Sequence, residues 1–295
     1  MKIRGSYPPN VACSDLEKMM RFELGQVLPV YDVVAKNYGA DHANKIHSDE
    51  GAAKYGFAGA LVPGVGLYAY LTRPVADALG REWLERGAMS AKLIKPVYDG
   101  EKVQAQATVV DNDPIELKLG LLNQSAELCA IGSAGLPNSL PAPDPNEYQF
   151  CALPNGAQLR AATIAGFSIG DALGSLEFNL DLKGELSQFL DNVVETSPIY
   201  GSVCHPAFWI AQANEILMRN ITLGPWIHTA SDARHYALAK DGERLALRGR
   251  VIDLYERRGH ELIVVDLGLF GENDRHVAHI KHTAIIRLRE GGSGE

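Results

Sequence analysis

The stretch DGEKVQAQATVVD, residues 99–111, has a counterpart that begins 142 residues later, DGERLALRGRVID at residues 241–253. Both read Asp-Gly-Glu, a basic residue and an aliphatic residue, and after five positions both end in valine, an aliphatic residue and aspartate. Asp-Gly pairs are common in turns between strands, so the match alone could arise by chance. Its length and spacing nevertheless indicate two copies of one structural unit.

The residues around the two segments correspond as well. An apolar helix candidate precedes each one, at 63–79 in the first half and at 206–220 in the second. We expect Pro74 to end or kink the first helix near Arg73, because proline lacks the N–H that a helix interior needs. Each segment is followed by two runs that alternate as half-buried antiparallel strands do. These runs are IELKLGLLN and AELCAIGSA in the first half, and ELIVVDLGLF and HVAHIKHTAIIRL in the second.

A long apolar helix followed by antiparallel strands is accommodated when the sheet curls around the helix. Two such units paired through their sheets form a double hot-dog fold, an α+β architecture. The segment GLPNSLPAPDPNEYQ has four prolines in fifteen residues and is too rich in proline for a strand interior. We therefore expect an N-terminal unit at 1–135, a proline-rich linker at 136–159, a C-terminal unit at 160–290, and an artificial linker at 291–295.

The composition excludes several classes of function. The 295 residues are 46% hydrophobic and 22% charged, which suits a globular protein with a substantial core. A net charge of −8 argues against nucleic acid or an anionic membrane surface as partner. The sequence shows neither the apolar region of a signal peptide nor a run of roughly 18–20 apolar residues. Four separated cysteines without a CxxC pair favour reduced thiols, so we expect a cytoplasmic protein.

A group of polar residues precedes the first helix candidate, in ADHANKIHSDEGAAKYGFAGALVPGVGLYAYL at residues 40–71. Asn44 and His47 have N-x-x-H spacing, a Gly-Phe pair follows at 56–57, and Gly64 stands at the expected helix start. This combination resembles the hydratase motif of the MaoC-like dehydratases, the (R)-specific enoyl-CoA hydratases. The pattern of that family is roughly D-x-N-P-x-H, then a short helix, an A…GF segment and a glycine at the start of the hot-dog helix.

The resemblance implies a hydratase or dehydratase that acts on a 2-enoyl or 3-hydroxyacyl thioester of CoA or acyl-carrier protein. It implies neither a metal nor a separate redox cofactor. In the family an Asp–His pair activates a water molecule, which makes His47 the central candidate here. His42 stands at the family's aspartate position and Asp41 lies one residue earlier, so either can be the partner of His47. Asn44 is expected to anchor the loop or to contact the substrate.

The start of the first helix is the candidate site for the thioester oxygen. Helix N-termini present unpaired N–H groups and a partial positive charge, and the groups available after Pro63 belong to Gly64, Val65 and Gly66. The second half has no N-x-x-H loop at the corresponding place, so we expect one site in the first half. The second half would complete the pocket, and its candidate residues are His205 and His228.

Two other functions remain open. A hot-dog thioesterase usually needs a carboxylate on the helix, and Asp77 and Glu215 lie far from the helix starts. A non-catalytic acyl-binding protein, or an enzyme of specialised metabolism, is the other alternative. The three histidines of HVAHIKH do not indicate a metal site, because side chains alternate on a strand and cannot all converge. One chain is already a pseudo-dimer, and pairing of two chains into a homodimer is also open.

Overall fold

The computed structural model describes residues 22–40 and 44–289, so Asp41 and His42 lie outside the described residues. The helices and strands of the first half are β1 (Tyr31–Val34), α1 (Asp49–Ala53), α2 (Gly64–Arg86), β2 (Ala88–Leu93), β3 (Lys102–Asn112), β4 (Ile115–Asn123) and β5 (Leu128–Gly135). Those of the second half are β6 (Arg160–Ala161), β7 (Ala172–Asn179), α3 (Glu185–Asn192), α4 (Pro206–Asn220), β8 (Ile221–Thr222), β9 (Ile227–His235), β10 (Arg244–Arg257), β11 (His260–Phe270) and β12 (His276–Arg287).

The main sheet has ten strands in the order β1-β3-β4-β5-β2-β9-β12-β11-β10-β7. Every neighbouring pair in it is antiparallel. The order is symmetric about its centre: β1 corresponds to β7, β3 to β10, β4 to β11, β5 to β12 and β2 to β9. The units meet where residues 88–92 of β2 pair with residues 230–234 of β9. The sequence repeat is therefore a structural repeat, and the units are joined through their sheets as predicted.

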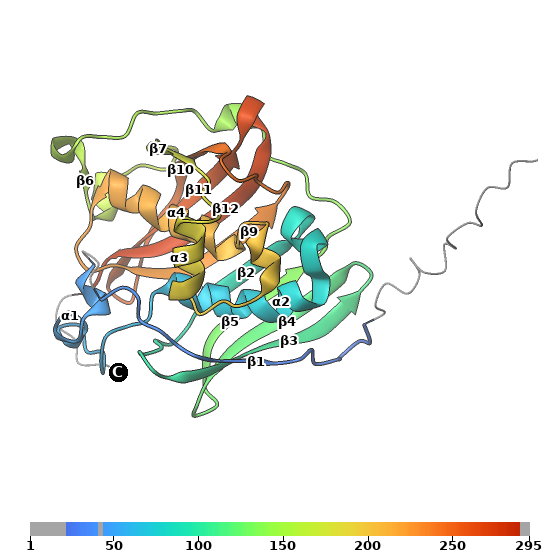
Figure 1. The fold of residues 1–295 in the computed structure, drawn as a ribbon. Helices are drawn as coiled ribbons and strands as arrows, with labels where there is room; N and C mark the ends of the chain where they lie inside the picture. The colour runs from blue at the N-terminus through green and yellow to red at the C-terminus, as the bar shows by residue number, and fades with distance from the viewer. Residues whose placement is uncertain (1–21, 41–43, 290–295) are drawn as a thin grey trace, which may run out of the picture.

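The two long helices lie against each other and against the sheet (Figure 1). α2 buries Tyr68, Leu71 and Val75, and α4 buries Ile210 and Ile216, in one cluster of apolar side chains that spans both units. Burial of one such side chain contributes about 1.5–3 kcal/mol, so these helices are a main source of stability. Among the described helices, none is long and apolar enough to cross a membrane.

α2 continues well past Pro74, so the prediction that this proline ends the helix near Arg73 is wrong. Proline removes one backbone N–H from the helix. The following residues Val75 and Ala76 are nevertheless buried in the core, and their burial favours continuation of the helix. The backbone leaves helical geometry at Gly80, where φ is +60°, a conformation that glycine adopts without a Cβ clash.

The proline-rich segment is docked onto the second unit. The Tyr148 side chain is buried, and its hydroxyl donates to Asp266 Oδ2 on β11 at 2.9 Å. The same ring packs against Phe270 and lies under the Arg250 guanidinium, 5.7 Å from the ring centroid. The segment expected as a linker thus crosses the outer side of β10 and β11 with a fixed anchor.

Candidate functional site

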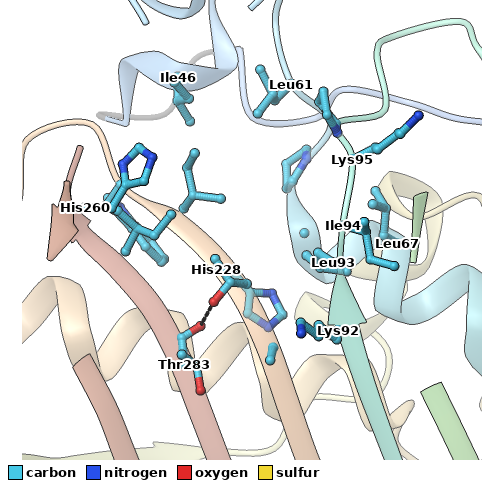
Figure 2. Close-up of a pocket in the computed structure, with 18 of the residues that line it drawn as sticks. Ile46, Leu61, Leu67, Lys92, Leu93, Ile94, Lys95, His228, His260 and Thr283 are labelled. Carbon is cyan, nitrogen blue, oxygen red and sulfur yellow. Dashed lines mark hydrogen bonds between the residues drawn. The ribbon is translucent and has the colours of Figure 1, made fainter. Parts of the chain in front are cut away.

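A cavity of about 670 Å³ lies where the start of α2 faces the first residues of β9. Both halves of the chain form its wall, together with the loop before α2 and the turn between β10 and β11. Figure 2 shows side chains from these segments around one space, with His228 at the lower centre and His260 and Lys95 on opposite sides. Much of the wall is apolar, including Ile46, Leu61, Leu67, Leu93, Ile227 and Ile285. A site of this size and character suits a small organic ligand.

His47 lines this cavity and is held by its own loop. Its Nδ1 lies 2.7 Å from the carbonyl oxygen of Leu61, and its own carbonyl accepts a hydrogen bond of 2.8 Å from Asn37 Nδ2. A carbonyl oxygen only accepts, so Nδ1 carries the proton. The neutral ring is therefore the Nδ1–H tautomer, whose lone pair is on Nε2. A general base at the cavity needs such a lone pair.

Asn44 connects the motif loop to the second unit. Its Nδ2 donates to the Trp226 carbonyl at 2.9 Å, and its Oδ1 accepts from Trp226 N at 3.3 Å and from Ile46 N at 3.4 Å. The two-way contact with Trp226 fixes the loop against the chain just before β9. These hydrogen bonds fit the first of the two roles expected for Asn44, which is to anchor the loop.

α2 begins at the cavity without a side-chain cap. Its N-cap residue Pro63 makes no capping side-chain bond, and Gly66 N–H donates to the Pro63 carbonyl at 2.8 Å. The N–H groups of Gly64 and Val65 have no acceptor within the helix, and the helix dipole adds a partial positive charge. Of the three predicted donors, Gly66 is thus engaged, and Gly64 is the one that lines the cavity.

Gly64 is also a packing residue. A Cβ atom at this position would lie 2.5 Å from Leu93 Cδ1 and 2.9 Å from His228 Nδ1. Both distances are far below van der Waals contact, so a larger side chain would displace its neighbours. A loss of activity in Gly64→Val would therefore have two causes, displacement of these neighbours and obstruction of the helix start.

His228, on β9, lines the cavity beside Gly64. Its Nε2 lies 2.8 Å from Ser231 Oγ, and its side chain is nearly inaccessible to solvent. Burial lowers the pKa of His228 to about 4, so the ring is neutral at pH 7. The second half therefore contributes a neutral imidazole to the wall of the cavity.

His205 is not among the residues that line the cavity, contrary to its prediction as a pocket residue. It is fully buried, and its Nδ1 accepts a hydrogen bond of 3.0 Å from Ala207 N in the first turn of α4. Burial lowers the pKa of His205, although Glu195, whose Oε2 lies 3.8 Å from His205 Nε2, acts in the opposite direction. His205 caps its own helix.

Four cationic side chains line the cavity, Lys92, Lys95, Arg257 and Arg258, and His260 lies beside them. The first two come from the end of β2 and the loop after it, and the others from the β10–β11 turn. Lys95 pairs with Glu127 at 2.6 Å. None of the described residues that line the cavity is an aspartate or a glutamate. The described wall of the cavity therefore carries positive and no negative side chains, although the protein as a whole is acidic.

Sequence reasoning missed this cationic group. The sequence contains ERRGH at 256–260 and KLIKP at 92–96, but these segments lie far apart along the chain. They meet because β2 and β10 belong to paired units of one sheet. An excess of positive over negative residues in both segments is the signal that could have suggested them.

Comparison with known proteins agrees with this architecture. No family model and no curated protein matches the sequence. Among solved structures, a protein of Chloroflexus aurantiacus assigned as a MaoC-domain dehydratase matches with a TM-score of 0.64 at 11% identity, covering 92% of this chain and 97% of that one.

A conserved protein of Mycobacterium tuberculosis with a double hot-dog fold matches with a TM-score of 0.59 at 15% identity, covering 90% of this chain and 96% of that one. A protein of Lactobacillus plantarum assigned as an oleoyl thioesterase matches with a TM-score of 0.55 at 8% identity, covering 92% and 98%. At such identities the likeness establishes the fold and leaves the reaction open. The predicted fold is confirmed: this chain has the double hot-dog fold that MaoC-like dehydratases share.

Proposed function

We propose that this protein is a hydratase or dehydratase of acyl thioesters, of the 2-enoyl and 3-hydroxyacyl type. The observation that carries the proposal is that His47 and the uncapped start of α2 line one largely apolar cavity. Such a cavity can hold an acyl chain between a general base and hydrogen-bond donors. Both are needed to add water across a conjugated double bond.

His47 is the proposed general base. With its proton on Nδ1 directed to the Leu61 carbonyl, Nε2 can accept a proton from water as the oxygen attacks C3, and the protonated ring then gives that proton to C2. In the reverse direction Nε2 removes the C2 proton and gives it to the departing hydroxyl group, which leaves as water. Asp41 and His42, both outside the described residues, remain the candidate partners of His47 in this role.

The start of α2 is the proposed binding site for the thioester oxygen. As water adds, negative charge develops on this oxygen, and donors that are already oriented stabilise it most effectively. The N–H group of Gly64, which lines the cavity, is such a donor, and that of Val65 follows it in the same turn; the helix leaves both without an internal acceptor. Gly64 also lets the ligand approach the backbone closely.

The cations around the cavity suit the carrier of the acyl group. CoA and acyl-carrier protein both present the thioester on a phosphorylated arm. Lys92 and Lys95 on one side, with Arg257 and Arg258 on the other, can bind phosphate by charge-assisted hydrogen bonds. Neither carrier is favoured over the other by these contacts.

Thioester hydrolysis receives less support. Hot-dog thioesterases of the kind considered above use a carboxylate, and the described wall of the cavity contains none. Asp77 instead pairs with Arg73 at 2.7 Å, and Glu215 lies 3.6 Å from Arg219, both along their own helices. Non-catalytic acyl binding would use the same cavity, and the experiment below distinguishes it from hydration.

The experiment is incubation of the protein with crotonyl-CoA while the enoyl absorbance and free thiol are followed separately. We expect loss of enoyl absorbance without thiol release, abolished by His47→Ala. Thiol release would instead indicate a thioesterase. Binding of crotonyl-CoA without either change would indicate an acyl-binding protein.

A further inference from the structure

Two buried histidines share one serine hydroxyl next to the cavity. Ser231 Oγ lies 2.8 Å from His228 Nε2 on β9 and 2.9 Å from His282 Nδ1 on β12. The two rings stack with centroids 4.5 Å apart and planes 25° from parallel. Their exposed fractions are 4% for His228, 3% for Ser231 and 0% for His282. The three groups therefore form one chain of hydrogen bonds that bulk water does not reach.

The single hydroxyl proton couples the two rings. A serine hydroxyl donates one hydrogen bond, so it donates to one imidazole and accepts from the other. If His228 Nε2 carries a proton, the hydroxyl donates to His282 Nδ1, and both rings are Nε2–H tautomers. If His282 Nδ1 carries the proton, the hydroxyl donates to His228 Nε2, and both rings are Nδ1–H tautomers. The two neutral histidines must therefore share the same tautomer.

The outer end of this chain faces the helix start. His228 Nδ1 has no hydrogen-bond partner among the described residues, and it lies 2.9 Å from the position that a Cβ of Gly64 would occupy. Leu93 Cδ1 lies at the same place, at the end of a flexible side chain that can turn aside. A buried polar atom without a partner is uncommon and calls for a functional explanation. An oxygen atom bound at the start of α2 would provide the missing partner.

We propose that His228 is a neutral hydrogen-bond donor to the thioester oxygen, and that Ser231 and His282 are positioning residues that keep its proton on Nδ1. This inference rests on the proposed function. A carbonyl oxygen only accepts, so its arrival selects the register in which both rings are Nδ1–H. Burial holds both rings neutral, since it lowers the pKa of His228 to about 4 and that of His282 well below its usual value. A neutral donor supports the oxyanion without giving up its proton.

The first test does not depend on turnover. Imidazole ¹⁵N NMR at pH 7, on protein saturated with butyryl-CoA, reads the tautomers directly, and this saturated thioester cannot be hydrated. We expect His228 and His282 both as Nδ1–H tautomers. Opposite tautomers on the two rings, or a charged His228, would overturn the proposal, as would failure of butyryl-CoA to bind. This readout remains valid if the protein binds the thioester but does not hydrate crotonyl-CoA.

The second test compares variants in crotonyl-CoA hydration. Losing one oxyanion donor lowers kcat by roughly 100-fold or more, so we expect that loss for His228→Leu. His228→Asn keeps an N–H near Nδ1 and should retain clearly more activity. Ser231→Ala should lower kcat about 10-fold with KM nearly unchanged, and Ser231→Thr should restore it.

Ser90→Ala is the matched control for Ser231→Ala. Ser90 lies on β2, the counterpart of β9, and its Oγ lies 3.1 Å from Ser133 Oγ. Ser90 does not line this cavity. We expect wild-type kcat for it. A Ser231→Ala variant that folds and turns over like the wild type would contradict the positioning role. If Ser231→Ala does not fold, the tautomers of the wild-type protein decide the question.

Discussion

The two long helices begin at matching places in the two units, but their first turns differ in chemistry. The start of α2 lines the cavity, and no side chain caps it. At the start of α4 the His205 ring turns back and accepts the N–H of Ala207. Ala207 lies 142 residues after Val65, so it is the counterpart of one of the proposed donors. In the second unit the protein's own imidazole thus occupies the place that corresponds to the proposed site of the ligand oxygen.

The surroundings of His205 complete this difference. The Tyr200 ring lies 4.3 Å from the imidazole centroid, and Phe189 lies 6.0 Å from it. Glu195 lies beside His205 Nε2 and also accepts a hydrogen bond of 3.0 Å from Arg73. Duplication thus preserved the frame of helix and sheet, while one unit filled its helix start and the other left it open. A helix N-terminus becomes a site only where its donors are left for a ligand.

The largest expected effect comes from the loop of the open site. His47→Ala should lower kcat for crotonyl-CoA hydration at least about 100-fold, the usual scale for removing a general acid–base group. Folding should be retained, because the ring is only partly buried and lies at the cavity wall. Steady-state kinetics and a thermal melt check both statements. An active His47→Ala protein would show that the motif no longer serves catalysis.

Substitution of the helix-start glycine should affect stability and ligand binding together. Gly64→Ala places a Cβ against Leu93 and His228, and such overpacking costs about 1–3 kcal/mol of unfolding free energy. Gly66→Ala, two residues later, is the control: its Cβ would meet Val62 at an ordinary 3.4 Å. We expect denaturant midpoints to fall for Gly64→Ala alone. Equal stability of the two variants would argue against the tight contact.

At the closed site the expectation is reversed. His205→Ala removes the cap of α4 and leaves a cavity in place of a fully buried ring, so it should cost more stability than the about 0.5–2 kcal/mol of a cap alone. Its kcat with crotonyl-CoA should stay at the wild-type value, since His205 does not line the cavity. Chemical denaturation and steady-state kinetics measure the two quantities. A large loss of kcat in a folded His205→Ala protein would mean that the second helix start takes part in the reaction.

The smallest expected effect is a dependence of stability on pH, to which His228 and His235 both contribute. Burial lowers the pKa of His228 and of His235 to about 4, below the 6.5 of an exposed histidine. The unfolded chain then binds more protons than the native protein between pH 6.5 and 4, so stability falls as the pH decreases through that window. Between pH 7 and 6 each histidine should cost about 0.7 kcal/mol. Urea melts measure this, and His235→Gln should flatten the dependence.

The repeat was sufficient to predict the fold, because an offset of 142 residues also relates β1 to β7 and β3 to β10. The repeat predicted α4 at its observed bounds, but it did not predict where α2 ends. Helix propensity favours an end at Pro74, but burial of Val75 in the core keeps the chain helical as far as Gly80. The helix continues after Gly80. Backbone preference is a small term beside burial of this kind.

The candidate site was only partly predictable. The N-x-x-H spacing predicted His47 as a site residue, and it lines the cavity; the offset suggested His205, and a strand-like segment beside the second helix suggested His228. Nothing in the sequence says that His205 bonds to its own helix while His228 faces the other helix. That distinction depends on the direction of two side chains and on the pairing of β2 with β9. The positive residues around the cavity depend on the same pairing.

The number of thioester sites per chain shows whether one helix start or both bind a ligand. Calorimetric titration of the purified protein with butyryl-CoA gives this stoichiometry without any turnover. We expect one site per chain, weakened or lost in Gly64→Ala and unchanged in His205→Ala. Two equivalent sites per chain, or one site that survives Gly64→Ala in folded protein and disappears in His205→Ala, would contradict this expectation.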